Sequence, residues 1–262
     1  MRSDILQYYG SINAAFLHAY AEAGTEFLLQ ELMATDDEII LELGCGTGGT
    51  LVKLKSRIPG LQLFGIDGSE TMVSRSRSRL RFCGISPGIS LQTVNLHNPL
   101  PFNDNTFHKI YAESVLGIQA GEQLQVIFCE ILRVLKPGGK LVLNETVWLD
   151  AISAQEIETI NDSCKKIFGI VQANSAFPTR RHWLQLMRSS GFSEVRAEEI
   201  SPVKSKIRAK VPELLSKLFS MFGKIRKLRP SLRRESAAYK IGSKSIYGNK
   251  RYMEGVLFSA VK

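Results

Sequence analysis

A carboxylate followed by closely spaced glycines is the part of this sequence that is richest in chemistry. The apolar run Ile39–Leu43 contains Glu42 and leads into glycines at positions 44, 46, 48 and 49. Glycine has no Cβ, so the backbone can turn sharply there and a ligand can contact the main chain. A helix that begins at such a turn points its free N–H groups and the positive end of its dipole at the ligand. The pattern therefore indicates a site for a nucleoside-bearing cofactor.

Two classes of cofactor fit this turn. Gly44, Gly46 and Gly49 match G-x-G-x-x-G, the dinucleotide fingerprint, which is weak evidence by itself. The carboxylate of Glu42 would repel a pyrophosphate, but it would attract the sulfonium and ammonium groups of S-adenosylmethionine, which has no phosphate. Glu42 therefore favours methyl transfer. A glycine turn that binds no ligand is the remaining alternative.

Polar residues at the ends of the next two predicted strands extend this site. The strand 61–66 leads into Asp67, about 20 residues beyond the glycine turn, where a doubly wound fold places an acid on the ribose hydroxyls. Capping of the helix predicted over 69–82 is an alternative role for Asp67. The following strand ends at Asn95 and Leu96, which are suited to contact the amino group and the face of an adenine.

Four motifs together resemble those of class I S-adenosylmethionine-dependent methyltransferases. They are the acidic glycine turn at 42–48, Asp67, the Leu-Pro-Phe-x-Asp-x-x-Phe run at 100–107 and the Leu-Lys-Pro-Gly-Gly run at 135–139. The resemblance covers about residues 36–148. It implies an α/β fold with a Rossmann-like, doubly wound sheet of seven strands, an antiparallel last strand and helical caps. It also implies S-adenosyl-L-methionine as the cofactor.

The resemblance further implies which residues bind that cofactor. Asn95 departs from the family pattern, which usually has Asp at this position, so the adenine contact is the weakest assignment. Paired tyrosines in the N-terminal helix of such enzymes often line the site, so Tyr9 is expected there. The alternative is that Tyr9 is an ordinary, partly buried aromatic residue. The expected cofactor-binding residues are Tyr9, Glu42, Gly44, Cys45, Gly46, Gly48, Asp67, Gly68, Met72, Asn95, Leu96 and Glu113.

Candidate catalytic side chains stand at the end of the fourth predicted strand and in two helices. Glu113 and Ser114 end that strand where the family faces the transferring methyl group, and the pair resembles an element of sterol, tocopherol and prenyl-chain methyltransferases. A carboxylate there would stabilise a carbocation or act as a base. A site-lining or capping acid is the alternative. His18 and His182 are the other catalytic candidates, each with a structural role as its alternative.

The spacing of apolar residues predicts the elements that position these groups. Residues 1–35 form a helical cap, with its helix over 5–34, and the core comprises 36–200 and 250–262. Helices beyond those already named are predicted over 121–136, 151–170 and 179–190. Further strands are predicted over 89–94, 109–113, 193–200 and 251–261, and the resemblance implies that the last two pair as an antiparallel hairpin.

Residues 201–249 form an insertion that carries the excess positive charge. Residues 201–251 hold 15 Lys and Arg against 2 Asp and Glu, a net charge of +13, whereas the rest of the chain has a net charge of −4. The centre of the insertion, 212–228, has the pattern of a basic amphipathic helix that begins with a proline. Three roles fit this pattern: a cap that encloses an apolar acceptor, contact with an anionic membrane surface, and contact with nucleic-acid phosphates.

The composition is that of a soluble protein of a reducing compartment. The chain has 262 residues, of which 44% are hydrophobic and 23% are charged. No apolar run is long enough to predict a membrane span, and the N-terminus lacks the apolar core of a signal peptide. The four cysteines show no C-x-x-C pairing, so we expect reduced thiols and no metal site. We therefore expect a cytoplasmic protein, with peripheral membrane contact as an alternative.

These observations predict an S-adenosylmethionine-dependent methyltransferase for a small, largely apolar metabolite, such as an isoprenoid or a polyketide, modified at carbon or oxygen. One alternative is an RNA methyltransferase that uses the basic insertion. The fourth strand lacks both the Asn/Asp-Pro-Pro-aromatic motif and a cysteine for base C5 attack, so nucleic acid is the less favoured partner. A second alternative is a non-catalytic S-adenosylmethionine-binding module. The sequence leaves open whether the chain forms a homo-oligomer.

Overall fold

A mixed β-sheet forms the centre of the molecule. The structure, a computed structural model, describes residues 4–18, 20–200 and 208–262. In these residues the sheet has seven strands in the order β3-β2-β1-β4-β5-β7-β6. Their bounds are β1 Ile39–Leu43, β2 Gln62–Asp67, β3 Ile89–Thr93, β4 Phe107–Glu113, β5 Leu135–Trp148, β6 Ser193–Glu199 and β7 Met253–Val261. Only β7 runs antiparallel to its neighbours β5 and β6, which confirms the predicted fold class and the predicted hairpin.

The strands are apolar because helices cover both faces of the sheet. Leu41, Ile110 and Leu141 stand side by side in three neighbouring strands and belong to one buried cluster. The next residues of two of those strands, Tyr111 and Val142, belong to the cluster on the opposite face. This alternation with a period of two places successive side chains on opposite faces.

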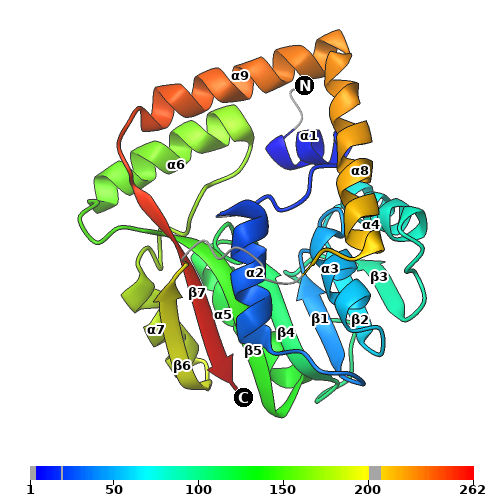
Figure 1. Ribbon diagram of the computed structural model, residues 1–262. Coiled ribbons are helices and arrows are strands. Elements are labelled where there is room, and N and C mark those ends of the chain that lie inside the picture. The colour runs from blue at the N-terminus through cyan, green and yellow to red at the C-terminus, as the bar shows by residue number, and fades with distance from the viewer. Residues whose placement is uncertain (1–3, 19, 201–207) are drawn as a thin grey trace.

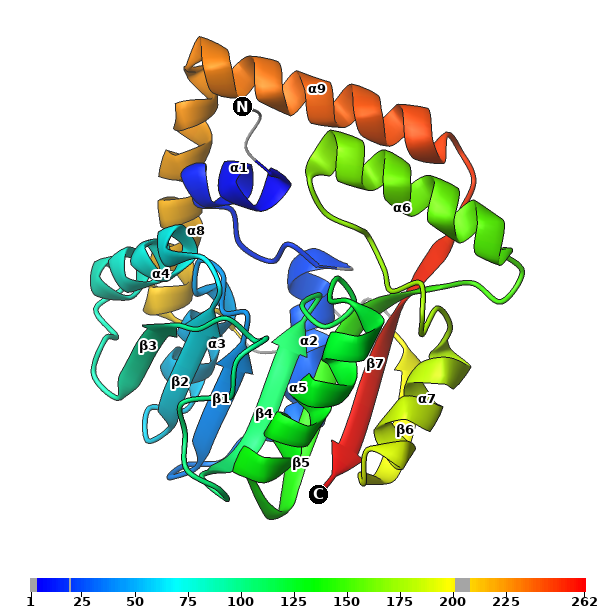
Figure 2. The same cartoon turned by 180° about the vertical axis from the view of Figure 1, so that it is seen from behind.

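Two layers of helices enclose these clusters (Figures 1 and 2). The layer formed by α2 (Ala21–Leu32), α3 (Gly49–Arg57) and α4 (Glu70–Phe82) covers one face. The layer formed by α5 (Gly121–Val134) and α7 (Arg180–Ser189) covers the other. The boundaries of α4, α5 and α7 agree with the predicted helices to within two residues.

A third group of helices lies beyond the carboxyl ends of the parallel strands (Figure 1). It comprises α1 (Ile5–Ser11), α6 (Ala154–Phe168) and α9 (Pro230–Tyr247), and α9 packs on both α1 and α6. Helix α8 (Val211–Ile225) and the short 3-10 helix η1 (Arg226–Leu228) connect this group to the layer of α3 and α4. No helix of the described segments has both the length and the apolar character needed to cross a bilayer.

The helix predicted over 5–34, for which the sequence left breaks at Gly10 and Gly24 open, is interrupted between these two glycines. Helix α1 ends at Ser11 and α2 begins at Ala21. Between them the backbone adopts positive φ angles at Asn13, Phe16 and Tyr20, which no helix allows. The prediction failed here because apolar residues at near-helical spacing also serve a loop that turns its side chains into the fold. Residues 1–3 and 19 of the predicted cap lie outside the described residues.

The insertion contains one helix more than the sequence pattern predicts. The predicted helix 212–228 corresponds to α8 and η1, but α9 follows at once. Pro230 is the first residue of α9, because proline both ends a preceding helix and suits the first position of the next one. The prediction used only the first property. Residues 201–207 of the insertion lie outside the described part of the chain.

Candidate functional site

The glycine turn joins β1 to α3 through residues that adopt left-handed backbone angles. Gly44, Gly46 and Gly48 have φ angles of +69°, +50° and +79°. A Cβ at Gly44 would overlap the side chain of Val115, and one at Gly48 would overlap Ser76. Both glycines are therefore required by conformation and by space, and the main chain of the turn stays open toward the ligand side.

Asp67 is held rigidly at the end of the neighbouring strand β2. Its Oδ2 accepts a hydrogen bond of 2.9 Å from the Gly46 N–H, and its Oδ1 accepts one of 2.9 Å from the Ser69 N–H. Burial raises the pKa of Asp67, and these two N–H groups oppose that shift. The helix cap of α4 is Ser69, whose Oγ accepts from the Met72 N–H at 3.4 Å. Asp67 therefore fixes the glycine turn and does not cap α4.

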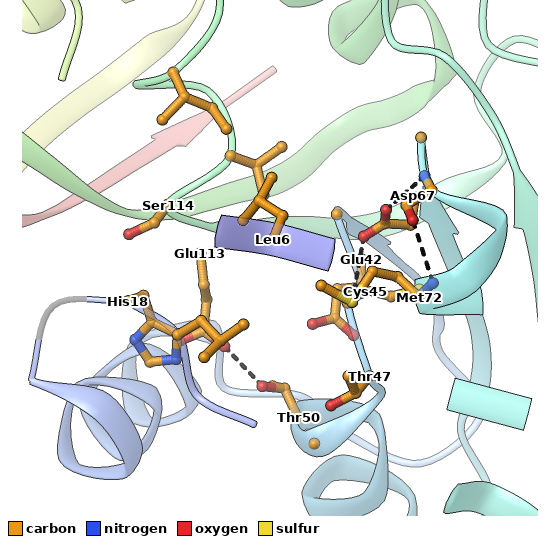
Figure 3. A pocket seen from close by; sticks show the side chains of 18 of the residues that line it. Leu6, His18, Glu42, Cys45, Thr47, Thr50, Asp67, Met72, Glu113 and Ser114 are labelled. Atoms are coloured by element: carbon orange, nitrogen blue, oxygen red, sulfur yellow. Dashed lines mark hydrogen bonds and ion pairs between the residues drawn. The ribbon is translucent and has the colours of Figure 1, made fainter. Parts of the chain in front are cut away.

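A cavity of ≈ 380 Å³ opens at this edge of the sheet. Figure 3 shows Glu113 and His18 on one side of it, Asp67 and Met72 on the other, and Glu42 between them in this view. The expected site residues that line it are His18, Glu42, Gly44, Cys45, Gly46, Asp67, Gly68, Met72, Asn95, Leu96 and Glu113. Apart from His18, in the loop between α1 and α2, and Met72, in α4, they come from the ends of the parallel strands and the loops that follow, where open α/β sheets bind ligands.

Glu42 is a buried carboxylate with an unsatisfied oxygen. The residue is 4% exposed, and its Oε2 has no hydrogen-bond partner among the described residues. Burial, and after it the charge of Glu113, raises the pKa of Glu42 well above the usual value of a carboxyl group. A cation placed beside it would reverse this shift, because an opposite charge favours the ionised form. The donor set thus fits a ligand that carries positive charge and no phosphate.

Glu113, at the end of β4, is a buried carboxylate with many partners. Its Oε1 accepts from Thr50 Oγ1 at 2.7 Å, and its Oε2 accepts from Thr25 Oγ1 at 2.9 Å. His18 Nε2 lies 3.0 Å from the same Oε2. Burial alone would raise the pKa of Glu113, but the charge of His18 and the hydrogen bonds of His18, Thr50 and Thr25 hold it below its usual value.

Asn144, on the adjacent strand β5, orients the His18–Glu113 pair from behind. Its Nδ2 lies 3.1 Å from His18 Nδ1 and 3.4 Å from Glu113 Oε2. With Nδ1 accepting from the amide, Nε2 carries the proton that faces Glu113. The Asn144 Oδ1 has no hydrogen-bond partner among the described residues. A rotation of the amide by half a turn would present Oδ1 to a protonated Nδ1, so the pocket accommodates His18 in either charge state.

Glu145, the next residue of β5, holds the loop that follows β4. Its Oε1 accepts from the N–H groups of Val115 at 3.0 Å and Leu116 at 2.9 Å, and its Oε2 accepts from Gly117 at 3.0 Å. Burial raises the pKa of Glu145 to about 7 although these three N–H groups oppose the shift. Ser114, with a φ of +54°, lines the cavity from this loop.

Three expected site residues do not line the cavity. His182 is exposed in α7, where its Nδ1 lies 2.8 Å from Thr179 Oγ1. Helix α7 buries Trp183 in the hydrophobic cluster that the layer of α5 and α7 covers. His182 therefore has no access to the cavity, and its catalytic assignment is corrected. Tyr9 packs on Tyr8, with ring centroids 5.6 Å apart, in the cluster beneath α6 and α9. Gly48 begins α3 behind the turn and acts through its conformation.

Several site residues were missed from the sequence. Thr50 follows the glycine turn directly, and a hydroxyl in the first turn of that helix was a usable signal. Asn144 pairs with Glu113 in the sheet register, and a polar residue within an apolar strand was a second signal. Thr25 lies in a helix with no polar pattern, and no sequence signal connects it to Glu113. The apolar residues that line the cavity, Leu6, Phe16, Leu17, Val115 and Ile118, were also missed.

Comparisons with known proteins agree with this geometry. Residues 40–139 match the family model of a methyltransferase domain. The sterol 24-C-methyltransferase of Pneumocystis carinii (strain B80) is 28% identical over 174 residues, which are 63% of this chain and 42% of that protein. The chain covers between 34% and 64% of the lengths of the first curated relatives that it matches.

Two solved structures share the fold over most of the chain. The [4+2]-cyclase SpnF has a TM-score of 0.62 at 23% identity, covering 91% of this chain and 79% of that one. The geranyl diphosphate C-methyltransferase from Streptomyces coelicolor A3(2), crystallised with Mg²⁺, geranyl-S-thiolodiphosphate and S-adenosyl-L-homocysteine, has a TM-score of 0.61 at 20% identity, covering 92% and 76%. Residues 40–139 thus match a methyltransferase domain, and the chain has the acidic glycine turn and the strand order that resemble those of class I S-adenosylmethionine-dependent methyltransferases.

Proposed function

We propose that this protein transfers a methyl group from S-adenosyl-L-methionine to a carbon or oxygen atom of a small, largely apolar acceptor. The observation that carries the proposal is the pair of buried carboxylates in one cavity. Glu42 has an oxygen without a partner among the described residues and suits a cationic ligand, whereas Glu113 is paired with His18 beside an apolar wall. One cavity thus offers a cofactor end and an acceptor end.

The cofactor end would hold S-adenosyl-L-methionine through groups of opposite charge and through the open main chain. When bound, this cofactor supplies a methyl group on a positively charged sulfur. Glu42 would face the cationic groups, and Asp67, which has lone pairs left after two N–H contacts, would accept hydrogen bonds from the ribose hydroxyls. Met72 and Leu96 would enclose the adenine, and Asn95 would contact its amino group.

The acceptor end combines an apolar surface with a proton acceptor. Leu6, Phe16, Leu17 and Ile118 line it and would exclude water from an apolar acceptor. Alignment of the reacting groups alone contributes about 7–11 kcal/mol in favourable cases. If a proton leaves, the Glu113–His18 pair can take it, and if a cation forms on the acceptor, the ionised Glu113 stabilises it. The names of the sterol and geranyl diphosphate methyltransferases support an isoprenoid-like acceptor.

Other functions of this site predict different products. SpnF is named as a [4+2]-cyclase, so the fold alone does not require methyl transfer. An RNA methyltransferase would use the basic insertion, and a non-catalytic module would bind the cofactor without turnover. The three outcomes differ in where label from the cofactor appears.

The experiment is incubation of the protein with methyl-tritiated S-adenosylmethionine and fractionated cell extract, followed by mass spectrometry of the labelled fraction. We expect label in an apolar small molecule whose mass increases by one methylene, and we expect Glu113→Gln to abolish it. Glu198→Gln, an exposed glutamate on β6, is the matched control and should be fully active. Label only in RNA, or tight binding with no labelled product in any fraction, would contradict the proposal.

A further inference from the structure

The amphipathic pattern of α8 predicts that its apolar side faces the fold. In the structure most of that side is exposed, and the opposite side packs on the fold. The residues it buries are Glu213, Ser216 and Gly223. Two of its large apolar residues, Leu215 and Phe219, are partly buried against the fold. The other six are between 43% and 69% exposed, and they are Val211, Leu214, Leu218, Met221, Phe222 and Ile225. No described residue of the insertion lines the candidate site cavity. The apolar stripe of α8 therefore does not enclose that cavity.

Buried ion pairs fix this orientation of α8. Glu213 is 3% exposed and accepts from Arg57 Nε at 3.1 Å and from Lys53 Nζ at 3.3 Å. Arg79 donates from Nη1 to the Ser216 carbonyl at 2.9 Å and to Ser220 Oγ at 3.0 Å. A rotation of the helix that hid its apolar stripe would leave buried charges without partners, which is strongly destabilising. The stripe is thus held outward.

The exposed stripe continues beyond α8. Leu228 of η1 is 79% exposed, and Phe82 of α4 is 43% exposed and lies 6.2 Å from Phe222 between ring centroids. We call these two residues and the six exposed apolar residues of α8 the apolar ridge. A continuous exposed apolar surface of this kind marks a site of interaction with a partner or a membrane.

Positive charge borders the apolar ridge. Lys210, Lys217 and Lys224 are seven residues apart, so they follow one edge of the helix. Lys217 also contacts Glu22 at 3.2 Å, whereas Lys224 is exposed. Residues 208–251 hold 13 Lys and Arg and only two acidic residues, of which Glu213 is buried in its ion pairs. The segment that carries the ridge is therefore strongly basic.

We propose that the apolar ridge docks on the surface of an anionic phospholipid bilayer, with its leucines and Phe222 among the lipid chains and its lysines on the headgroups. An amphipathic helix that lies in the plane of the interface has this arrangement of an apolar face and flanking cations. A second copy of the chain would bring two basic surfaces together, and nucleic acid offers nothing to cover the apolar side chains. Figures 1 and 2 show α8 on the flank of the molecule, where a flat surface can reach it.

Co-sedimentation with large vesicles tests this proposal. We expect binding to phosphatidylcholine vesicles that contain phosphatidylglycerol, weakening as salt rises, and little binding to pure phosphatidylcholine. Each lysine near an anionic surface contributes about 1 kcal/mol, so Lys224→Ala should weaken binding about fivefold. The double variant Leu214→Gln with Leu218→Gln should weaken it about tenfold or more.

Matched controls lie elsewhere on the surface. Val126→Gln changes an exposed apolar residue of α5 in the opposite helix layer, and Lys166→Ala changes an exposed lysine of α6. Both should bind vesicles as the parent protein does. All four proteins should unfold at the parent temperature, because the changed side chains are exposed.

Four results would overturn the proposal. One is equal binding to neutral and anionic vesicles, and another is binding that the ridge variants leave unchanged. The third is a dimer in light scattering that the double variant abolishes while no variant or parent sediments with vesicles, which would assign the ridge to a second copy. Binding of RNA in place of vesicles would also overturn it.

Discussion

Glu42 and Glu113 stand at the ends of two neighbouring strands in one cavity, yet their surroundings differ. Glu42 has an unsatisfied oxygen, and burial raises its pKa. Glu113 is just as deeply buried, but His18, Thr25 and Thr50 hold its pKa below the usual value. The comparison shows that burial does not decide the charge of a carboxyl group. The partners supplied by neighbouring elements decide it, and Oε2 of Glu42 has no such partner among the described residues.

The largest expected effect comes from removing the charge of Glu113. Glu113→Gln keeps the shape but loses the carboxylate that pairs with His18, so kcat should fall by about 10²–10⁴-fold, the usual contribution of a positioned acid or base. The dissociation constant of the cofactor, measured by calorimetry, should change little. An equal loss in both quantities would mean that Glu113 belongs to the cofactor end, and the distinction between the two carboxylates would fail.

Removal of the Glu42 charge should change the dissociation constant of the cofactor. Glu42→Gln should weaken the binding of S-adenosylmethionine about 10–100-fold, since a charge-assisted hydrogen bond contributes about 1.5–3 kcal/mol. Because burial disfavours the ionised form of Glu42 and its Oε2 has no partner among the described residues, the variant should be at least as stable as the parent in thermal unfolding. Asp67→Ala should also weaken binding, through the loss of the ribose contact and of the Gly46 anchor. Unchanged affinity in both variants would contradict the assignment of the cofactor end.

Glu145 extends the comparison to a third buried carboxylate. Burial raises its pKa, and three N–H groups do not fully offset that effect. Its folded pKa of about 7 exceeds its ordinary value of 4.5. The folded protein therefore retains a proton that the unfolded chain releases, and stability falls as pH rises from about 4.5 to about 7. From pH 5 to pH 7 the loss attributable to Glu145 should be about 2 kcal/mol.

The difference between parent and Glu145→Gln in urea unfolding at several pH values isolates this contribution. The glutamine variant should lose less stability than the parent over that interval. A parent protein that gains stability relative to the variant as pH rises would show that the three N–H groups outweigh burial.

The smallest expected effect concerns one of the hydrogen bonds to Glu113. Thr25→Val removes the 2.9 Å hydrogen bond to Oε2 while preserving the shape of the side chain. The pKa of Glu113 should then rise by up to about one unit, equivalent to about 1.4 kcal/mol. The acid limb of the pH–rate profile should move to higher pH by the same amount. If the acid limb of the profile does not move, the protonation of Glu113 does not control the rate.

The cofactor end could be predicted from the sequence because its residues are close together along the chain. The spacing of Glu42 to the glycines and the distance to Asp67 are fixed by a strand, a turn and a helix, so local pattern suffices. The acceptor end could not be predicted in the same way. His18, Thr25, Glu113 and Asn144 come from the N-terminal loop, α2, β4 and β5, and only tertiary packing brings them together.

The same reasoning explains the errors in the insertion and at His182. The periodicity of α8 was predicted correctly, but periodicity does not state which side faces the fold. The buried partners of Glu213 decide that, and they stand more than 150 residues earlier in the chain. His182 has the residue type of a catalytic group, but α7 packs on the face of the sheet away from the cavity floor, so the residue type was insufficient.

Calorimetric titration of S-adenosylmethionine in buffers of different ionisation enthalpy tests the central claim most directly. If Glu42 meets a cationic ligand, its raised pKa must fall on binding, so the parent protein should release protons and Glu42→Gln should release fewer. A dinucleotide should show no comparable uptake. Equal proton release by both proteins, or tight binding of a dinucleotide in place of S-adenosylmethionine, would contradict the account.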